Sequence, residues 1–193
     1  MSNETLKVNY LDKIVKAIKT RKKFIIFASI IIFIFLLTFL FYKNSQEKNN
    51  INIAEKYTQA LILTKQKKVE ESKLLLEKII NKNHQFYSPL ALYHIIDNDI
   101  EKDTSKVITS FDKILKNNSI SKENLNLIKI KKAIYLINLK KEKDIIATLN
   151  PVINSNSVWK TLAVNTISEY FLSNGQEIKA EEYNQLLNSK IKK

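Results

Sequence analysis

The stretch FIIFASIIIFIFLLTFLFY, residues 24–42, contains no charged residue, no glycine and no proline. A helix over these 19 residues would extend for about 28 Å, close to the thickness of a bilayer's hydrocarbon core. Fifteen of them are Phe, Ile or Leu, and Ser29 and Thr38 are too few to reverse the preference for lipid. We therefore expect a transmembrane helix rather than a core helix of a soluble protein, which rarely runs so long without a charge.

Basic residues on either side of this stretch predict its orientation. Seven precede it and three follow within twenty residues: Lys7, Lys13, Lys16, Lys19, Arg21, Lys22 and Lys23 before, and Lys43, Lys48 and Lys56 after. Because Lys and Arg are in excess on the cytoplasmic side of a membrane, we expect the N-terminus in the cytoplasm and residues 43–193 outside it. The stretch leads into polar residues and not into a small-residue cleavage site, which indicates a retained anchor.

Four segments follow from this reading of the chain. Residues 1–23 form a basic cytoplasmic tail, residues 24–42 the transmembrane helix, residues 43–50 (KNSQEKNN) a polar linker, and residues 51–193 one exported domain. In the tail, apolar residues recur at helical spacing between lysines: Leu11, Ile14, Val15 and Ile18. This pattern favours an amphipathic helix on the inner leaflet, or a topology signal without a binding role.

Composition excludes several classes of function. Of the net charge of +13, 23 Lys minus 16 acidic residues leaves +7 from residue 49 onward. All but one of the 32 basic residues are Lys, which indicates codon bias rather than the Arg-containing surface of a nucleic-acid-binding protein. The absence of Cys excludes disulfides and thiolate metal sites, so the exported domain must be stable through its hydrophobic core.

The exported domain is predicted to be all-α, because apolar residues recur at intervals of three and four throughout. The expected helices cover residues 51–66, 69–82, 88–98, 104–117, 122–139, 142–153, 157–173 and 177–190. Pro89 fits the first turn of a helix after Ser88, whereas Pro151 should end or kink the helix that contains it.

Pairing these helices gives about four units whose second helices share a pattern. The first buried positions of these second helices are expected at Ser72, Val107, Ile145 and Ala180, which are 35, 38 and 35 residues apart. A period close to 34 is typical of helix-turn-helix repeats that stack into an α-solenoid. In the fourth unit Asn184 and Asn188 replace apolar residues, as expected for a terminal repeat with a solvated outer face.

The last unit resembles a tetratricopeptide repeat. The motif's Leu, small residue, Tyr, Gly and Ala correspond to Ile167, Ser168, Phe171, Gly175 and Ala180. Gly175 is the only glycine in the chain and lies at the turn between two helices, where a positive φ is needed. Lys67 occupies the corresponding turn of the first unit, so the consensus is degraded there. A plain helical bundle is the alternative.

The layout of tail, single anchor and tetratricopeptide-like domain resembles the ancillary subunit of the bacterial Sec translocon. Residues 54–61 and 168–183 carry the sequence part of the resemblance. The resemblance implies a single-pass protein of the bacterial inner (cytoplasmic) membrane whose periplasmic domain works with translocon subunits, periplasmic chaperones and an anchored prolyl isomerase. It implies no catalytic residue. The alternative is a scaffold for cell-envelope assembly or cell division that uses the same repeat surface.

Stacked helix pairs would offer a surface to a segment of a partner protein. Four aromatic residues are candidates for lining it, or else are ordinary core residues: Tyr57, Tyr93, Tyr135 and Trp159. We expect no enzyme, cofactor or small-molecule substrate, because His84 and His94 have no metal-ligand pattern around them and no nucleophile motif is present. Residues 97–103 imitate a calcium loop, but Lys102 and Ile108 occupy the positions that need Gly and Glu.

Overall fold

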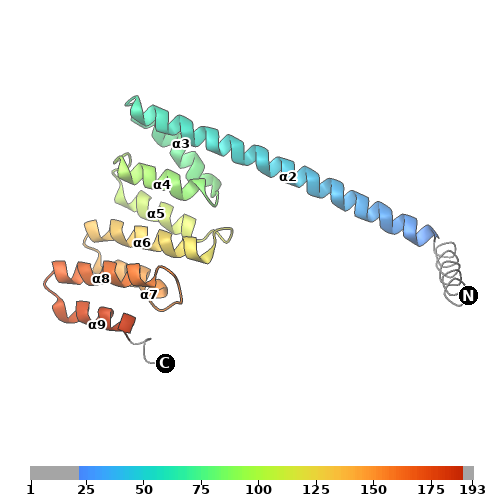
Figure 1. Ribbon diagram of the computed structural model, residues 1–193. Helices are drawn as coiled ribbons and strands as arrows, with labels where there is room; N and C mark the ends of the chain where they lie inside the picture. Colours follow the sequence, from blue (N-terminus) through green and yellow to red (C-terminus); the bar gives the residue numbers. More distant parts are fainter. Residues whose placement is uncertain (1–21, 189–193) are drawn as a thin grey trace, which may run out of the picture. The chain divides into compact units, whose positions relative to one another are not determined.

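The computed structural model describes residues 22–188 of the chain, and within them it contains helices and no strand (Figure 1). The all-α prediction is therefore confirmed for this part of the chain, while the predicted amphipathic helix falls on the tail, almost all of which lies outside it. The helices are α2 (Lys22–Lys65), α3 (Val69–Lys82), α4 (Tyr87–Asp97), α5 (Thr104–Leu115), α6 (Lys122–Asn138), α7 (Glu142–Ile153), α8 (Lys160–Ser173) and α9 (Glu177–Asn188).

Most helix ends differ from the prediction by no more than three residues. Pro151, expected to disturb α7, lies in its last turn, and the helix continues to Ile153. The ring removes one N–H there, close to where the helix ends in any case. Helix α8 begins at Lys160 instead of residue 157. In the connection before it, Ser157 Oγ accepts a hydrogen bond from the backbone N–H of Trp159 at 3.1 Å.

The linker expected at residues 43–50 is not a break in the helix, because α2 is continuous from Lys22 to Lys65. These residues include Lys, Gln and Glu, which are good helix formers, and neither Gly nor Pro, so polarity alone did not end the helix. By its internal contacts the chain divides into two compact units, residues 1–52 and residues 53–193. The first unit contains the apolar stretch, and the second contains the remaining helices.

In the second unit, successive helices run in opposite directions and each packs on the next (Figure 1). We call residues 53–65, α4, α6 and α8 the first helices, and α3, α5, α7 and α9 the second helices. The turns from a first to a second helix lie along one edge, which we call the turn edge. The connections from a second helix to the next first helix lie along the opposite edge, which we call the loop edge (Figure 1).

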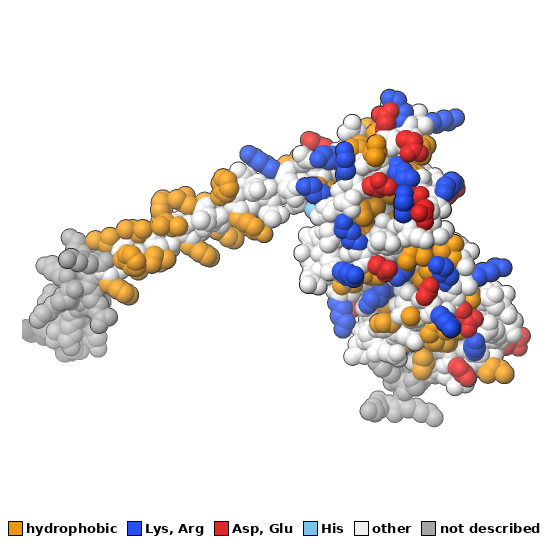
Figure 2. All heavy atoms as spheres, turned by 180° about the vertical axis from the view of Figure 1, so that it is seen from behind, with side chains coloured by type: hydrophobic (Ala, Val, Ile, Leu, Met, Phe, Trp, Pro, Cys, Tyr) orange, Lys and Arg blue, Asp and Glu red, His pale blue; other side chains and the backbone are white. Residues whose placement is uncertain are grey.

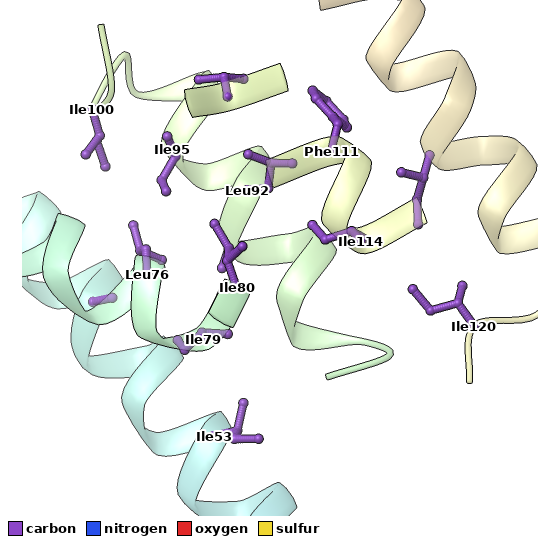
Figure 3. Close-up of a cluster of buried hydrophobic side chains, with 14 residues drawn as sticks. Ile53, Leu76, Ile79, Ile80, Leu92, Ile95, Ile100, Phe111, Ile114 and Ile120 are labelled. Atoms are coloured by element: carbon purple, nitrogen blue, oxygen red, sulfur yellow. The ribbon is translucent and has the colours of Figure 1, made fainter. Parts of the chain in front are cut away.

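The core of the second unit consists of two clusters of buried apolar side chains. Figure 3 shows the first, in which Ile53 of α2, Leu76 of α3, Leu92 of α4 and Phe111 of α5 belong to one cluster. The second cluster joins α6, α7, α8 and α9 around Phe171. Each fully buried Leu, Ile or Phe contributes about 1.5–3 kcal/mol relative to an exposed one, so these clusters hold the helices together.

The four turns of the turn edge share one backbone geometry. Each contains a residue in the left-handed region, namely Lys67, Asp99, Lys140 or Gly175, with φ between 52° and 70°. At each of these turns the next residue's N–H donates to the carbonyl five residues back, as Lys68 does to Leu63 at 2.9 Å and Gln176 does to Phe171 at 2.9 Å. This is the Schellman motif, which satisfies the last carbonyls of a helix. Three of the four turns form it without glycine.

Candidate interaction surfaces

The first candidate surface is the apolar part of α2. Residues 26–65 contain the one helix in the described part of the chain that is long and apolar enough to cross a membrane, with a mean hydropathy of 2.4 and no buried residue in its most apolar window. Ser29 Oγ and Thr38 Oγ1 donate to the carbonyls of Ile26 and Phe35, each at 2.8 Å. Both hydroxyls are thus satisfied inside the helix, as an environment without water requires.

The second candidate surface is the outer side of the first helices, which we call the first-helix face. On α6, Leu127, Lys131 and Ile134 recur at i, i+4 and i+7, so they share one side of the helix. Ile134 is 45% exposed, and on α8 Leu162 is 43% exposed. Lys131 Nζ lies 5.8 Å from the centre of the Tyr93 ring of α4, so the outer sides of α4 and α6 adjoin.

The charge on this face is sparse. Lys131 lies in the middle of its α6 stripe, and Glu169 occupies the corresponding stripe on α8. Only aromatic residues were named from the sequence as candidates for the surface, so this face, with Ile134 and Leu162, was missed. The i, i+4, i+7 stripe on α6, set apart from the buried stripe of Ile130 and Ala133, is the signal that could have found it.

The four aromatic residues proposed from the sequence do not form one site. Tyr57 lies against Tyr87, with ring centres 5.7 Å apart, and Tyr135 lies 6.2 Å from Phe111. Both pack against the first core cluster, as Tyr93 does, whereas Trp159 packs against the second. Burial raises the pKa of Tyr93 to about 12. These residues therefore act mainly as core aromatics, and Tyr93 alone is seen in contact with a side chain of the first-helix face.

Helix α5 is flanked by two hollows. One, of about 320 Å³, lies against α3 and α4 and has Ile80, Leu92 and Val107 in its floor, with Glu101 and Lys106 at the side. The other, of about 380 Å³, lies against α6 and α7. Figure 2, which views the molecule from the side opposite to Figure 1, shows Lys and acidic side chains interspersed over the helical unit. The residues that line each hollow include both lysine and acidic side chains.

The two histidines hold α4 in place as neutral rings. His84 Nδ1 accepts hydrogen bonds from the backbone N–H groups of Phe86 and Tyr87, each at 3.1 Å, and so caps the start of α4. His94 Nδ1 lies 3.2 Å from Asn98 Nδ2, and His94 Nε2 lies 2.9 Å from Thr64 Oγ1, the donor in each pair depending on the tautomer of the ring. Burial lowers the pKa of both rings.

The His94 ring belongs to a network of hydrogen-bonding side chains. Thr64 and Ser72 complete the network, their hydroxyl oxygens lying 2.8 Å apart, and Ser72 Oγ donates to the carbonyl of Ala60 at 2.9 Å. The cluster is a structural connection between α2, α3 and α4.

The segment that imitates a calcium loop uses its acids in other ways. Asp99 pairs with Lys102, and Asp103 caps α5 by accepting from the N–H of Ser105 at 2.9 Å. Glu101 accepts the N–H of Asp103 at 2.8 Å and pairs with Lys73 at 2.9 Å. These two interactions lower the pKa of Glu101 to about 2. In the described part of the chain, no three His or acidic side chains come together as a metal site would require.

No family model, no curated protein and no solved structure matches the chain.

Proposed function

We propose that the protein is a membrane-anchored adaptor whose helical unit is a tetratricopeptide-like repeat of four helix pairs. In this proposal residues 24–42 anchor the chain in a bacterial inner membrane, and the first-helix face binds a segment of a partner protein in the periplasm. The single observation that carries the proposal is the recurrence of the same inter-helix geometry at a period close to 34 residues.

The crossing of the two helices in each pair supports the repeat. In each pair, a buried residue of the first helix lies twelve positions before a buried residue of the second: Ala60 and Ser72, Ile95 and Val107, Ala133 and Ile145, Ser168 and Ala180. The first members are separated by 35, 38 and 35 residues, and so are the second members. Because the spacing within each pair is always twelve, the extra three residues lie between Val107 of α5 and Ala133 of α6.

Hydrogen bonds between successive pairs give a second support. Asn117 Nδ2 donates to the carbonyl of Asn83 at 2.6 Å, and Ser157 Oγ donates to Glu123 Oε2 at 2.6 Å. Gln176 Nε2 donates to Glu142 Oε2 at 3.2 Å. In each bond the partners are 34 residues apart, which is the expected offset between equivalent places in neighbouring repeats.

The first-helix face supports a role in binding a segment of another protein. Ile134 and Leu162 are partly exposed apolar side chains on neighbouring helices. The first-helix face carries few charges besides Lys131, so an aliphatic segment can lie against it. Such a face suits a helical or extended segment with apolar residues spaced along it and an acidic residue near Lys131.

For the partner, we propose the Sec translocon, with the protein as an ancillary subunit that works beside periplasmic chaperones on emerging chains. The support is the resemblance in layout and the short motifs at residues 54–61 and 168–183. The alternative is a scaffold for envelope assembly or cell division, which would use the same face with other partners.

The test is photocrosslinking of tagged full-length protein in its native membrane. A photoreactive amino acid replaces Ile134 on the first-helix face or Lys78, an exposed residue of α3, as the matched control. Crosslinked partners are then identified after purification in mild detergent. We expect translocon subunits or periplasmic chaperones to be crosslinked from position 134 and not from position 78.

Two results would overturn parts of the proposal. Crosslinks from position 134 to division or outer-membrane assembly proteins, without any translocon component, would replace the translocon by the scaffold alternative. Equal crosslinking from both positions would show that the first-helix face is not the binding surface.

A further inference from the structure

The two edges of the helical unit differ in charge. We define each edge as the last residue of one helix, the connection, and the first two residues of the next helix. The turn edge then comprises residues 65–70, 97–105, 138–143 and 173–178, with seven Lys and seven acidic residues. The loop edge comprises residues 82–88, 115–123 and 153–161, with four Lys and one acidic residue. Its lysines are Lys82, Lys116, Lys122 and Lys160.

The loop edge is one surface, because hydrogen bonds join its three connections. The connection after α5 reaches the one after α3 through Asn117 and Asn83, and the start of α6 reaches the connection after α7 through Glu123 and Ser157. Figure 1 shows the three connections along the same edge.

The helix dipole accounts for only two of the four lysines. Lys82 ends α3 and Lys116 is the C-cap of α5, where the dipole favours a positive charge. Lys122 and Lys160 are the first residues of α6 and α8, where the dipole disfavours one. The one acid, Glu123, is already occupied, because its Oε2 accepts from Ser157 Oγ at 2.6 Å and from the N–H of Val158 at 3.2 Å. The edge therefore keeps a positive field that the folded chain itself does not neutralise.

Two apolar side chains stand among these lysines. Phe86 is 59% exposed and Val158 is 78% exposed, and each lies just before the start of a first helix. Lysines with exposed apolar side chains between them are the combination that an anionic lipid surface attracts, the charges acting on headgroups and the apolar groups entering the interface.

The tether keeps this edge close to a bilayer. Ten residues, 43–52, separate the apolar stretch from the start of the helical unit at Ile53. As a helix they extend for about 15 Å, and fully stretched for about 35 Å. The helix of residues 53–65 ends at the turn edge, so its beginning, where the chain enters the unit, lies toward the loop edge. A site tethered so closely meets the lipid surface at a high effective concentration.

We infer that the loop edge binds the anionic headgroups of the membrane in which the protein is anchored. The inference rests on the membrane anchor of the proposed function and not on the identity of the protein partner. Binding at this edge would leave the turn edge away from the lipid and the first-helix face open to a partner. The alternative occupant is an acidic protein, which the tether argument disfavours because the lipid is always within reach.

The test uses full-length protein reconstituted in lipid nanodiscs. The chain has no Cys, so Asn118→Cys on the loop edge and Asn138→Cys on the turn edge each give one site for a fluorophore. Discs contain phosphatidylcholine with or without phosphatidylglycerol, and a headgroup-spin-labelled lipid quenches any fluorophore near the surface. We expect strong quenching at position 118 only with phosphatidylglycerol, reduced by high NaCl, and little quenching at position 138.

A charge variant and a matched control sharpen the test. Replacing Lys82, Lys116 and Lys122 by Gln should lower the ratio of protein with its loop edge bound to lipid to protein with its loop edge free, by about fivefold per lysine. Replacing Lys67, Lys140 and Lys141 of the turn edge by Gln should leave quenching at position 118 unchanged. Far-UV circular dichroism checks that both variants are folded.

The inference is overturned if both positions are quenched equally, if quenching ignores phosphatidylglycerol and salt, or if the loop-edge variant behaves like the control. The inference is also overturned if position 118 is not quenched and an acidic protein binds the unmodified chain but not the loop-edge Gln variant. The occupant of the edge would then be that acidic protein. Whether the protein co-purifies with the discs is measured separately. A protein that does not co-purify with them would contradict the membrane anchor itself and so the proposed function.

Discussion

The first and the last helix pair reach the same geometry with different residues. In the first pair the small residue of the first helix is Ala60 and that of the second is Ser72, whose Oγ donates to the Ala60 carbonyl at 2.9 Å. In the last pair the types are exchanged, and Ser168 Oγ donates to the carbonyl of Ala180 at 3.3 Å. The comparison teaches that these two terminal pairs cross through small side chains and one bridging hydroxyl, which can lie on either helix. The middle pairs have Ile95 with Val107 and Ala133 with Ile145 at the same positions and no such hydroxyl.

The two pairs also differ in how they fill the space beside the crossing. Three residues after the crossing position, the first pair has Leu63 and the last has Phe171. Four residues after the second crossing position, the first pair has the fully buried Leu76, whereas the last has Asn184, whose Oδ1 accepts from Ser168 at 2.8 Å. The last pair thus has a larger side chain on its first helix, Phe171 instead of Leu63, and a polar one on its second helix, Asn184 instead of Leu76.

The largest expected effect comes from removing that ring. Phe171→Ala should lower the free energy of unfolding by about 3–5 kcal/mol, because Phe171 is fully buried and stacks on Tyr183 at 5.6 Å. Leu63→Ala, at the equivalent place in the first pair, should cost about 2–3 kcal/mol, because Leu63 is 9% exposed. Thermal unfolding of the full-length protein in detergent measures both. Equal losses would contradict the unequal filling of the two pairs.

The next effect separates the two bridging hydroxyls. Ser72→Ala should lower stability by about 1–3 kcal/mol, since it removes the partner of Thr64 Oγ1 and the donor to the Ala60 carbonyl. Ser168→Ala should cost less, about 1 kcal/mol, because Asn184 is half-buried and can turn to water. Hydrogen exchange followed by mass spectrometry assigns each loss to its own helix pair. A greater loss at Ser168 would reverse the comparison.

The turns give a smaller effect of opposite sign in the two pairs. Gly175→Ala should destabilise by about 1 kcal/mol through backbone strain alone, since a Cβ there would meet no atom within 4 Å and φ is 70°. Lys67→Gly, where φ is 62°, should stabilise by about 0.5–1 kcal/mol. Chemical denaturation of each variant checks the signs. Stabilisation by Gly175→Ala would show that the turn does not need a positive φ.

The smallest effect is a dependence on pH at the contact of the first pair with α4, where His94 bonds Thr64, whereas the last pair has no histidine. Burial lowers the pKa of His94, with Asp97 acting in the opposite sense. Because the folded-state pKa lies below that of the unfolded chain, the stabilisation is present above about pH 6.5 and is lost as the pH falls through the folded-state pKa. Protection factors in α4, which correct for the intrinsic pH dependence of exchange, should therefore fall on acidification, while those in α8 should change less. His94→Asn should weaken this dependence.

Much of the fold could be predicted from the sequence, because long amphipathic patterns report which side of a helix is buried. The spacing of Ser72, Val107, Ile145 and Ala180 was read from that pattern, and all four residues are buried. Residues 43–50, expected to be a polar linker, are part of a continuous helix, because polar residues without Gly or Pro remain compatible with a helix. Local composition signals exposure, and exposure alone does not end a helix.

The candidate surfaces were harder to predict. Lys67 was taken as a degraded turn, yet its backbone adopts the same left-handed conformation as Gly175, because the packing of the two helices outweighs a modest local strain. Asn184 was expected to face solvent and instead accepts a hydrogen bond from Ser168. The charge difference between the two edges depends on which connections lie side by side, and no single stretch of sequence contains that information.

The alternation of helix direction has a consequence for how such a chain can change its length. Residues 53–188 contain an even number of helices, so the chain enters the unit and α9 ends at the same edge (Figure 1). Duplication or loss of a whole pair, in steps of 35 or 38 residues here, preserves that arrangement. Gain or loss of a single helix would carry the end of the unit to the opposite edge. Relatives are therefore expected to differ by whole pairs inserted after an existing pair.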